Sequence, residues 1–172
     1  MKQIRIVGGN TLSGIINISG AKNSAVALVP ASLLSDDVVT IDNVPNISDI
    51  DALNEILIWL GATVKREDGT MIIDPSSIVN KEIPENISKK LRASYYFMSA
   101  LLGKYKHVEM SFPGGCSIGK RPIDLHLKGF KALGAKVSGD DEKIILDADE
   151  LVGTDIYLDF ASVGATINIM LA

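Results

Sequence analysis

The 172-residue sequence has little cysteine and few aromatic residues, and each shortage excludes a class of protein. Its one cysteine cannot form a disulfide within the chain, so we exclude a disulfide-stapled secreted domain and expect a reducing compartment. Because aromatics make up only 5% of the residues, the core must be built from Ile, Leu, Val and Ala. Hydrophobic residues at 47% and charged residues at 22% suffice for a packed core and argue against disorder.

The sequence also lacks an excess of positive charge and a long hydrophobic run. Asp and Glu outnumber Lys and Arg by 21 to 17, so nothing attracts nucleic acid or an anionic membrane surface in general. The longest apolar stretch, about 25–34, is interrupted by Pro30 and is shorter than the roughly 20 residues of a membrane span. The N-terminus has no apolar segment of the secretory type. We therefore expect a cytoplasmic protein that binds neither nucleic acid nor membrane.

What the sequence does contain is an internal repeat. Leu60–Val64 (LGATV) recurs as Leu133–Val137 (LGAKV), and each is followed by a polar turn and an apolar strand that ends in Asp. Alternating strand patterns at 39–41 and 108–110 each follow a helical pattern that ends in Leu-Leu. The spacing predicts strand–helix–strand–helix–strand units at about 10–75 and 80–148, and the start of a third at about 152–172.

Four helices are predicted from their apolar spacing and their ends. Gly61 and Gly134 suit the positions just after two of them, and Ser48–Asp51 has the spacing of a capping box. The third unit stops inside a helix that has just begun, so we expect a truncated chain; the alternative is a short terminal helix docked on unit two. The predicted helices are 21–34, 50–60, 88–102 and 122–133, and the predicted opening strands are 16–18 and 156–158.

The segment Phe112–Pro122 holds the densest set of reactive and charged residues. Glycines flank Cys116, and glycine lets backbone approach a ligand closely. Lys120 and Arg121 follow, and nearby cations favour the thiolate form of a cysteine. These residues predict a reactive thiol, with a buried and inert cysteine as the alternative.

Two helix starts and one arginine are candidate sites for an anionic ligand. Lys22 lies in the first helical turn, where free N–H groups and the helix dipole attract anions. Ser162–Thr166 is a similar device at the third helix, and Arg92 holds nearly the place in unit two that Lys22 holds in unit one. The alternatives are solvated cations and an ordinary serine cap. No His, Cys and Asp cluster has metal-site spacing, so we expect neither metal nor cofactor.

Residues 113–126, PGGCSIGKRPIDLH, resemble the catalytic loop of the UDP-N-acetylglucosamine 1-carboxyvinyltransferases, the MurA branch of the enolpyruvyl transferases. Gly20–Ser24, Leu91–Ser94 and Ser162–Thr166 match further motifs of that family in order and spacing, so the resemblance covers the entire chain. It implies an α/β (α+β) fold of repeated βαβαβ(β) units in an inside-out α/β barrel. Here two units would be complete and the third cut. Family members are more than twice as long, with two lobes and the active site between them, so the second lobe would be absent.

The resemblance implies a reaction and its substrates. The enolpyruvyl group of phosphoenolpyruvate would pass to the 3′-hydroxyl of UDP-N-acetylglucosamine, with release of phosphate and without a cofactor or metal. This is the first committed step of peptidoglycan synthesis, on which cell-wall formation, cell shape and cell division depend. The chain alone would be inactive, because the general base and further phosphate-binding arginines belong to the second lobe.

The resemblance also implies roles for residues of this sequence. Cys116 would be the general acid that protonates the enolpyruvyl methylene carbon, and the target of epoxide antibiotics such as fosfomycin. Lys22 would hold phosphoenolpyruvate with Asn23 beside it, and Arg92 and Arg121 would add positive charge. The implied catalytic residues are Cys116, Lys22 and Arg121, and the implied substrate-binding residues are Lys22, Asn23, Arg92, Arg121, Pro122, Ile123, Asp124, Leu125, Ser162, Val163 and Gly164.

Two alternative functions stay open at this point. The sister enzyme 5-enolpyruvylshikimate-3-phosphate synthase shares the fold and the enolpyruvyl donor but lacks the Gly-Gly-Cys loop. A stand-alone sugar-nucleotide or anion-binding module is the non-enzymatic alternative. The sequence departs from some relatives at Tyr96, where certain members have Trp, and at Phe160, where certain members have Lys. These departures concern contacts to the sugar nucleotide and leave the expected reaction unchanged.

Overall fold

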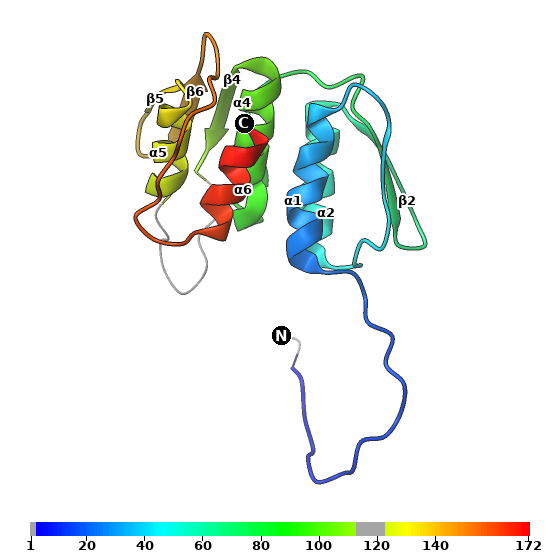
Figure 1. The fold of residues 1–172 in the computed structure, drawn as a ribbon. Helices are drawn as coiled ribbons and strands as arrows, with labels where there is room; N and C mark the ends of the chain where they lie inside the picture. Colours follow the sequence, from blue (N-terminus) through cyan, green and yellow to red (C-terminus); the bar gives the residue numbers. More distant parts are fainter. Residues whose placement is uncertain (1–2, 113–122) are drawn as a thin grey trace.

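The computed structural model describes residues 3–112 and 123–172 (Figure 1). A first antiparallel sheet has the order β1-β3-β2, with β1 (Val39–Ile41) and β2 (Thr63–Glu67) on either side of β3 (Thr70–Asp74). Side chains of the central strand alternate between buried and half-buried, as expected for a sheet with one face on the core.

A second sheet repeats this arrangement. Its order is β4-β6-β5, with β4 (His107–Ser111) and β5 (Lys136–Gly139) paired antiparallel to β6 (Lys143–Asp147). The same connectivity in both sheets confirms the repeat inferred from the two LGA motifs, while the unit boundaries 10–75, 80–148 and 152–172 stay a prediction. The mixed α/β class is confirmed.

Helices α1 (Lys22–Ala31), α4 (Tyr95–Tyr105) and α6 (Val163–Leu171) lie between the two sheets (Figure 1). Figure 1 shows α1, α4 and α6 side by side in the centre, with one sheet on each outer side. A 3-10 turn at Ser32–Leu34 extends the first helix, and another at Arg92–Ser94 leads into the fourth. The helices are α1 (Lys22–Ala31), α2 (Ser48–Leu60), α3 (Glu85–Ser88), α4 (Tyr95–Tyr105), α5 (Asp124–Ala132) and α6 (Val163–Leu171). No helix in the described ranges has both the length and the apolar character to cross a bilayer.

Helix α4 is the centre of the core. Its residues from Tyr95 to Leu102 are all buried, because α1, α6 and β4 pack against it. Phe97, Met98 and Leu101 are fully inaccessible, and burial of each such side chain contributes roughly 1.5–3 kcal/mol. A helix that is apolar on every side must lie inside a protein, which explains much of the high hydrophobic content.

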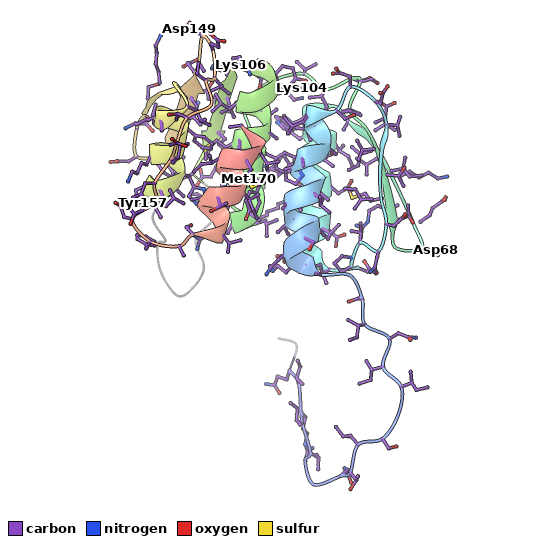
Figure 2. The ribbon with its side chains drawn as sticks, in the orientation of Figure 1. Asp68, Lys104, Lys106, Asp149, Tyr157 and Met170 are labelled. Atoms are coloured by element: carbon purple, nitrogen blue, oxygen red, sulfur yellow. The ribbon has the colours of Figure 1, made fainter. Side chains whose placement is uncertain are left out.

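Lys104 ties the two units together at the far end of α4. Its Nζ donates to the carbonyl oxygen of Ser35 at 2.7 Å and lies 3.0 Å from Oδ1 of Asp36. Figure 2 shows Lys104 where the ends of α1 and α4 meet. The contact fixes α4 against the segment that follows α1.

The predicted helix ends agree with the structure in one respect and differ in another. Gly61 and Gly134 have φ of 107° and 105°, a left-handed conformation that glycine adopts without strain, so both predicted helix stops are confirmed. The predicted start of the third helix at 88 is wrong. Leu91 is extended, with φ of −139° and ψ of 130°, and it separates α3 from the turn into α4.

The capping box predicted at Ser48–Asp51 is wrong. Helix α2 begins at Ser48 itself and no side chain caps it. Both aspartates instead pair with cations of other elements: Asp49 forms an ion pair with Lys22, and Asp51 accepts from Nη1 of Arg66 at 2.6 Å. Tertiary ion pairs therefore replace the local cap.

The predicted opening strands at 16–18 and 156–158 are also wrong. Both segments lack regular structure, and Ile16, Ile18 and Tyr157 are 85%, 91% and 80% exposed. Figure 2 shows the side chains of the N-terminal segment extending away from the sheets and helices. A strand needs a neighbour to pair its backbone groups, and none lies beside these segments within the described residues.

A close backbone contact positions the start of α1. A Cβ added at Gly20 would overlap the carbonyl oxygen of Asn43. The absence of a side chain therefore lets the chain before α1 lie directly on the loop before α2. This approach brings Lys22 next to Asp49.

A buried polar pair joins α5 to α6. His126 is 4% exposed and Asn168 is fully buried, and Nδ2 of the asparagine lies 2.9 Å from Nδ1 of the imidazole. Burial, followed by the charge of Arg92, lowers the pKa of His126 to about 4, and Asp124 acts weakly in the opposite direction. The folded protein therefore keeps this histidine neutral at physiological pH.

We expect Gly20→Ala to destabilise the fold by about 1–3 kcal/mol, because the new methyl group has no room beside the backbone of Asn43. Gly8→Ala is the matched control, since a Cβ there would have nothing within 4 Å. The measurement is the free energy of unfolding in denaturant. Equal stabilities of the two variants would contradict the close packing before α1.

We expect acid to destabilise the fold through His126. Its pKa falls from 6.5 in the unfolded chain to about 4 in the folded one, so this contribution is complete above 6.5 and is lost as pH falls toward 4. Its size is roughly 3 kcal/mol. The free energy of unfolding is measured in denaturant at several pH values between 4 and 6.5. Its dependence on pH should lose the His126 contribution in His126→Gln and keep it in the exposed control His107→Gln. Equal slopes for the two variants would contradict the assignment.

Candidate functional site

A pocket of about 740 Å³ lies where the N-terminal ends of four helical segments meet. Lys22 opens α1, Arg92 opens the turn into α4, Asp124 opens α5 and Val163 opens α6, and all four line the pocket. Figure 1 shows the starts of α1 and α6 at the same end of the molecule. The N–H groups of a helix's first turn have no partner inside the helix, so this end of the protein carries partial positive charge.

The α1 side of the pocket contributes Lys22 and Asn23. Lys22 forms an ion pair with Asp49 from the first turn of α2, while about half of its side chain stays exposed. The lysine is thus neither free nor fully neutralised, and an anion in the pocket competes with the carboxylate of Asp49 for the ammonium group.

The α4 side contributes a guanidinium group and two tyrosines. The Cζ atom of Arg92 lies 5.9 Å from the ring centroid of Tyr95, and the Tyr95 and Tyr96 rings pack edge to face at 4.6 Å. Burial raises the pKa of Tyr96, and the neighbouring Tyr95 adds to this effect. Tyr96 therefore keeps its O–H proton at neutral pH and can donate it in a hydrogen bond.

The α5 side contributes Asp124, Leu125 and His126. Asp124 is exposed and lies in the first turn, where its charge is favoured by the helix dipole. Ile123, also predicted to bind substrate, packs against the hydrophobic core as the residue before the helix. The predicted residues Cys116, Arg121 and Pro122 lie outside the described residues.

The α6 side contributes Ser162, Val163 and Gly164. Oγ of Ser162 accepts from the backbone N–H of Ala165 at 3.2 Å, so this serine is an ordinary helix cap as well as a lining residue. A Cβ added at Gly164 would lie 2.8 Å from the hydroxyl oxygen of Tyr95. Glycine at this position lets the start of α6 approach the side chain of Tyr95.

The pocket therefore suits a ligand that is anionic and partly apolar. Lys22, Arg92 and the helix starts attract negative charge, whereas Asp49 and Asp124 confine it to part of the pocket. Apolar and aromatic side chains fill the remaining wall, as in most small-molecule sites. Within 3–112 and 123–172, no group of three or more His, Cys, Asp or Glu side chains is placed to hold a metal ion.

Most of the predicted site residues that can be described come together in this one pocket. The lining residues that were not predicted as site residues include the polar or aromatic side chains of Asp49, Tyr95 and His126. Nothing in the sequence relates Asp49 to Lys22, which precedes it by a full helix and strand. Tyr96 and Phe160, noted only as departures from some relatives, also line the pocket. The predicted residues in the wall are Lys22, Asn23, Arg92, Asp124, Leu125, Ser162, Val163 and Gly164.

Comparison with curated proteins gives relatives that match the whole of this chain. The chain is 52% identical over 172 residues to UDP-N-acetylglucosamine 1-carboxyvinyltransferase 2 of Bacillus subtilis (strain 168), with 100% of this chain and 40% of that protein covered. It is 54% identical over 173 residues to the protein of the same name from Bacillus cereus (strain ZK / E33L), again with 100% and 40% covered. The chain thus spans about 40% of the length of these curated relatives.

Solved structures and a family model agree with these relatives. The enolpyruvyl transferase NikO from Streptomyces tendae matches with a TM-score of 0.72 and 27% identity, over 84% of this chain and 32% of that one. The expected fold, that of an enolpyruvyl transferase lobe, is confirmed by this match. The family model described as EPSP synthase (3-phosphoshikimate 1-carboxyvinyltransferase) matches residues 6–172. The chain therefore belongs to the EPSP synthase family of enolpyruvyl transferases.

Proposed function

We propose that this chain is part of an enzyme that transfers the enolpyruvyl group of phosphoenolpyruvate to the 3′-hydroxyl of UDP-N-acetylglucosamine. The observation that carries the proposal is the pocket in which Lys22 and Arg92 lie at converging helix starts. Both substrates are anions, and such a pocket attracts anions. The names of the relatives at 52% and 54% identity support UDP-N-acetylglucosamine as the acceptor.

In this proposal Lys22 and Arg92 bind the phosphate and carboxylate groups of phosphoenolpyruvate. Fixed positive charges favour the reaction, because they lie in place before the oxocarbenium-like intermediate forms and need no rearrangement. Asn23 is next to Lys22 in the first turn of α1 and donates to the same substrate.

Cys116 is the proposed general acid. As the 3′-hydroxyl oxygen bonds to C2 of the enolpyruvyl group, its proton goes to the general base of the second lobe and the thiol gives its proton to C3. In the later step C3 loses a proton and phosphate leaves C2, which restores the double bond. A group in this role works best when its pKa lies near the working pH. Lys120 and the proposed catalytic Arg121, four and five residues later in the sequence, are the cations that stabilise the thiolate.

The proposed sugar-nucleotide site uses the opposite wall. Asp124 and Leu125 contact the uridine, together with Arg121, Pro122 and Ile123 from the preceding segment. Ser162–Gly164 lies beside the diphosphate, where the start of α6 favours negative charge. Ile123 packs on the core, so in this proposal it contributes through its backbone.

The remaining partner in this proposal is the rest of the enzyme. The curated relatives are more than twice as long as the matched part, and the missing portion supplies the second lobe, the general base and further arginines. We also propose a cytoplasmic location, where phosphoenolpyruvate and the nucleotide sugar are made, and a place at the first committed step of peptidoglycan synthesis.

The second candidate is the reaction named in the family model, enolpyruvyl transfer to shikimate 3-phosphate. Both reactions use the same donor, so the residues around phosphoenolpyruvate do not separate them. The Gly-Gly-Cys sequence at 114–116 and the names of the relatives favour the nucleotide sugar. A binding module without activity is the remaining alternative.

We expect the 172-residue chain alone to release no phosphate from phosphoenolpyruvate and UDP-N-acetylglucosamine, because the general base is missing. A fusion of this chain to the unmatched part of the Bacillus subtilis relative should release phosphate only when both substrates are present. Cys116→Ala in the fusion should lower the rate by roughly 10² to 10⁴, the usual contribution of a general acid. Phosphate release by the chain alone, or full activity of the variant, would contradict the proposal.

We expect Arg92→Ala in the same fusion to lower kcat/KM by about 10- to 100-fold, because a hydrogen bond between two charged groups is lost. Arg66→Ala is the matched control, since this arginine pairs with Asp51 on the surface. Steady-state kinetics with each substrate varied gives both values. A similar loss in the two variants would mean that Arg92 acts only through stability.

A further inference from the structure

The amide group of Asn168 makes two contacts that together determine its orientation. Nδ2 lies 3.2 Å from the carbonyl oxygen of Gly164 and 2.9 Å from Nδ1 of His126. A carbonyl oxygen can only accept a hydrogen bond, so the NH₂ group and not the amide oxygen must face it. The same NH₂ group therefore donates to Nδ1 of His126.

This orientation fixes the tautomer of the imidazole. When Nδ1 accepts a hydrogen bond it carries no proton, and the proton of a neutral imidazole is then on Nε2. The groups that face the ring are the charged Arg92 and Asp124 and the aromatic Tyr95. Burial and Arg92 disfavour a second proton, so the ring stays neutral and Nε2 is its single N–H donor.

The other edge of the ring faces the pocket wall. His126 lines the pocket, and a Cβ added at Gly164 would lie 3.2 Å from Cε1 and 3.5 Å from Nε2. The ring of Tyr95 packs on it at 4.7 Å between centroids, with an angle of 61° between the planes. Tyr95, Gly164 and Asn168 therefore all lie against the imidazole.

Asn168 contributes little to the free energy of folding through this arrangement. Its Oδ1 is buried and has no hydrogen-bond partner within the described part of the chain. A buried polar atom without a partner is unfavourable for folding, whereas an apolar side chain of similar size would carry no such penalty. The amide instead stabilises the tautomer with its proton on Nε2, because it donates to Nδ1. An apolar side chain would favour neither tautomer.

We propose that Asn168 is a positioning residue that holds His126 as an Nε2–H donor in the pocket wall, where it donates to an oxygen of the bound anionic ligand. The identity of that ligand, the nucleotide sugar, rests on the proposed function. The tautomer and its control by Asn168 do not. Unlike Lys22 and Arg92, this donor is uncharged, so it adds direction without adding to the positive charge of the pocket.

The test is a long-range ¹H–¹⁵N correlation spectrum of the ¹⁵N-histidine-labelled 172-residue chain at neutral pH. The sequence has two histidines, and His107→Gln assigns their signals. We expect His126 to have a protonated Nε2 and an unprotonated Nδ1. In Asn168→Asp the carboxylate can only accept, so Nδ1 should become protonated. The control Asn46→Asp makes the same charge change in an exposed loop and should leave the His126 signals in place.

Two results would overturn the positioning role: a protonated Nδ1 in the wild type, or an unchanged His126 spectrum in a folded Asn168→Asp variant. The wild-type spectrum alone decides the tautomer if the variant does not fold. Titration of the ¹⁵N-histidine-labelled fusion protein with UDP-N-acetylglucosamine should shift the Nε2 signal that His126→Gln assigns, and Asn168→Asp in the fusion should weaken binding about tenfold. Binding without a change at Nε2 overturns the donor role. Absence of binding by the wild-type fusion protein counts against the proposed function and leaves the tautomer assignment standing.

Discussion

The burial of α4 on every side is the constraint on which the rest of this structure depends. A helix without a polar face must be covered, and here α1 covers one side, α6 another and β4 a third. Because α1 and α6 lie near opposite ends of the chain, their packing against α4 brings the starts of helices that are far apart in the sequence to one place. The pocket is the consequence. Its positive potential comes from helix N-termini that packing around α4 brings together, and Lys22 and Arg92 add full charges.

The walls of the pocket come from different helices, and each wall presents a different type of functional group. The first unit supplies an ammonium group held by Asp49, and the second supplies a guanidinium group over the ring of Tyr95. Helix α6 supplies a serine-capped start and the buried amide of Asn168. One ligand can therefore meet charge, aromatic surface and directed hydrogen bonds together. This combination of groups suits the two proposed substrates, one with a phosphate and a carboxylate and the other a nucleotide sugar.

Much of the fold could be predicted from the sequence, because the repeat and the helix patterns are local signals. The LGA motifs locate both hairpins, and Gly61 and Gly134 end the helices before them. The errors have one physical cause. Whether the segment 16–18 forms a strand depends on a partner strand, and whether Asp51 completes a capping box with Ser48 depends on Arg66, so neither is determined locally. For the same reason the sequence pointed to Lys22 and Arg92 but not to Tyr95 or His126, whose places follow from tertiary packing.

The choice of acceptor is the sharpest test of the proposed enolpyruvyl transfer to a nucleotide sugar in this pocket. The fusion protein can be given phosphoenolpyruvate with equal amounts of UDP-N-acetylglucosamine and shikimate 3-phosphate, and the products identified by mass spectrometry. We expect the enolpyruvyl group on the 3′-oxygen of UDP-N-acetylglucosamine and shikimate 3-phosphate recovered unchanged. Transfer to shikimate 3-phosphate, with the nucleotide sugar recovered unchanged, would contradict the proposal.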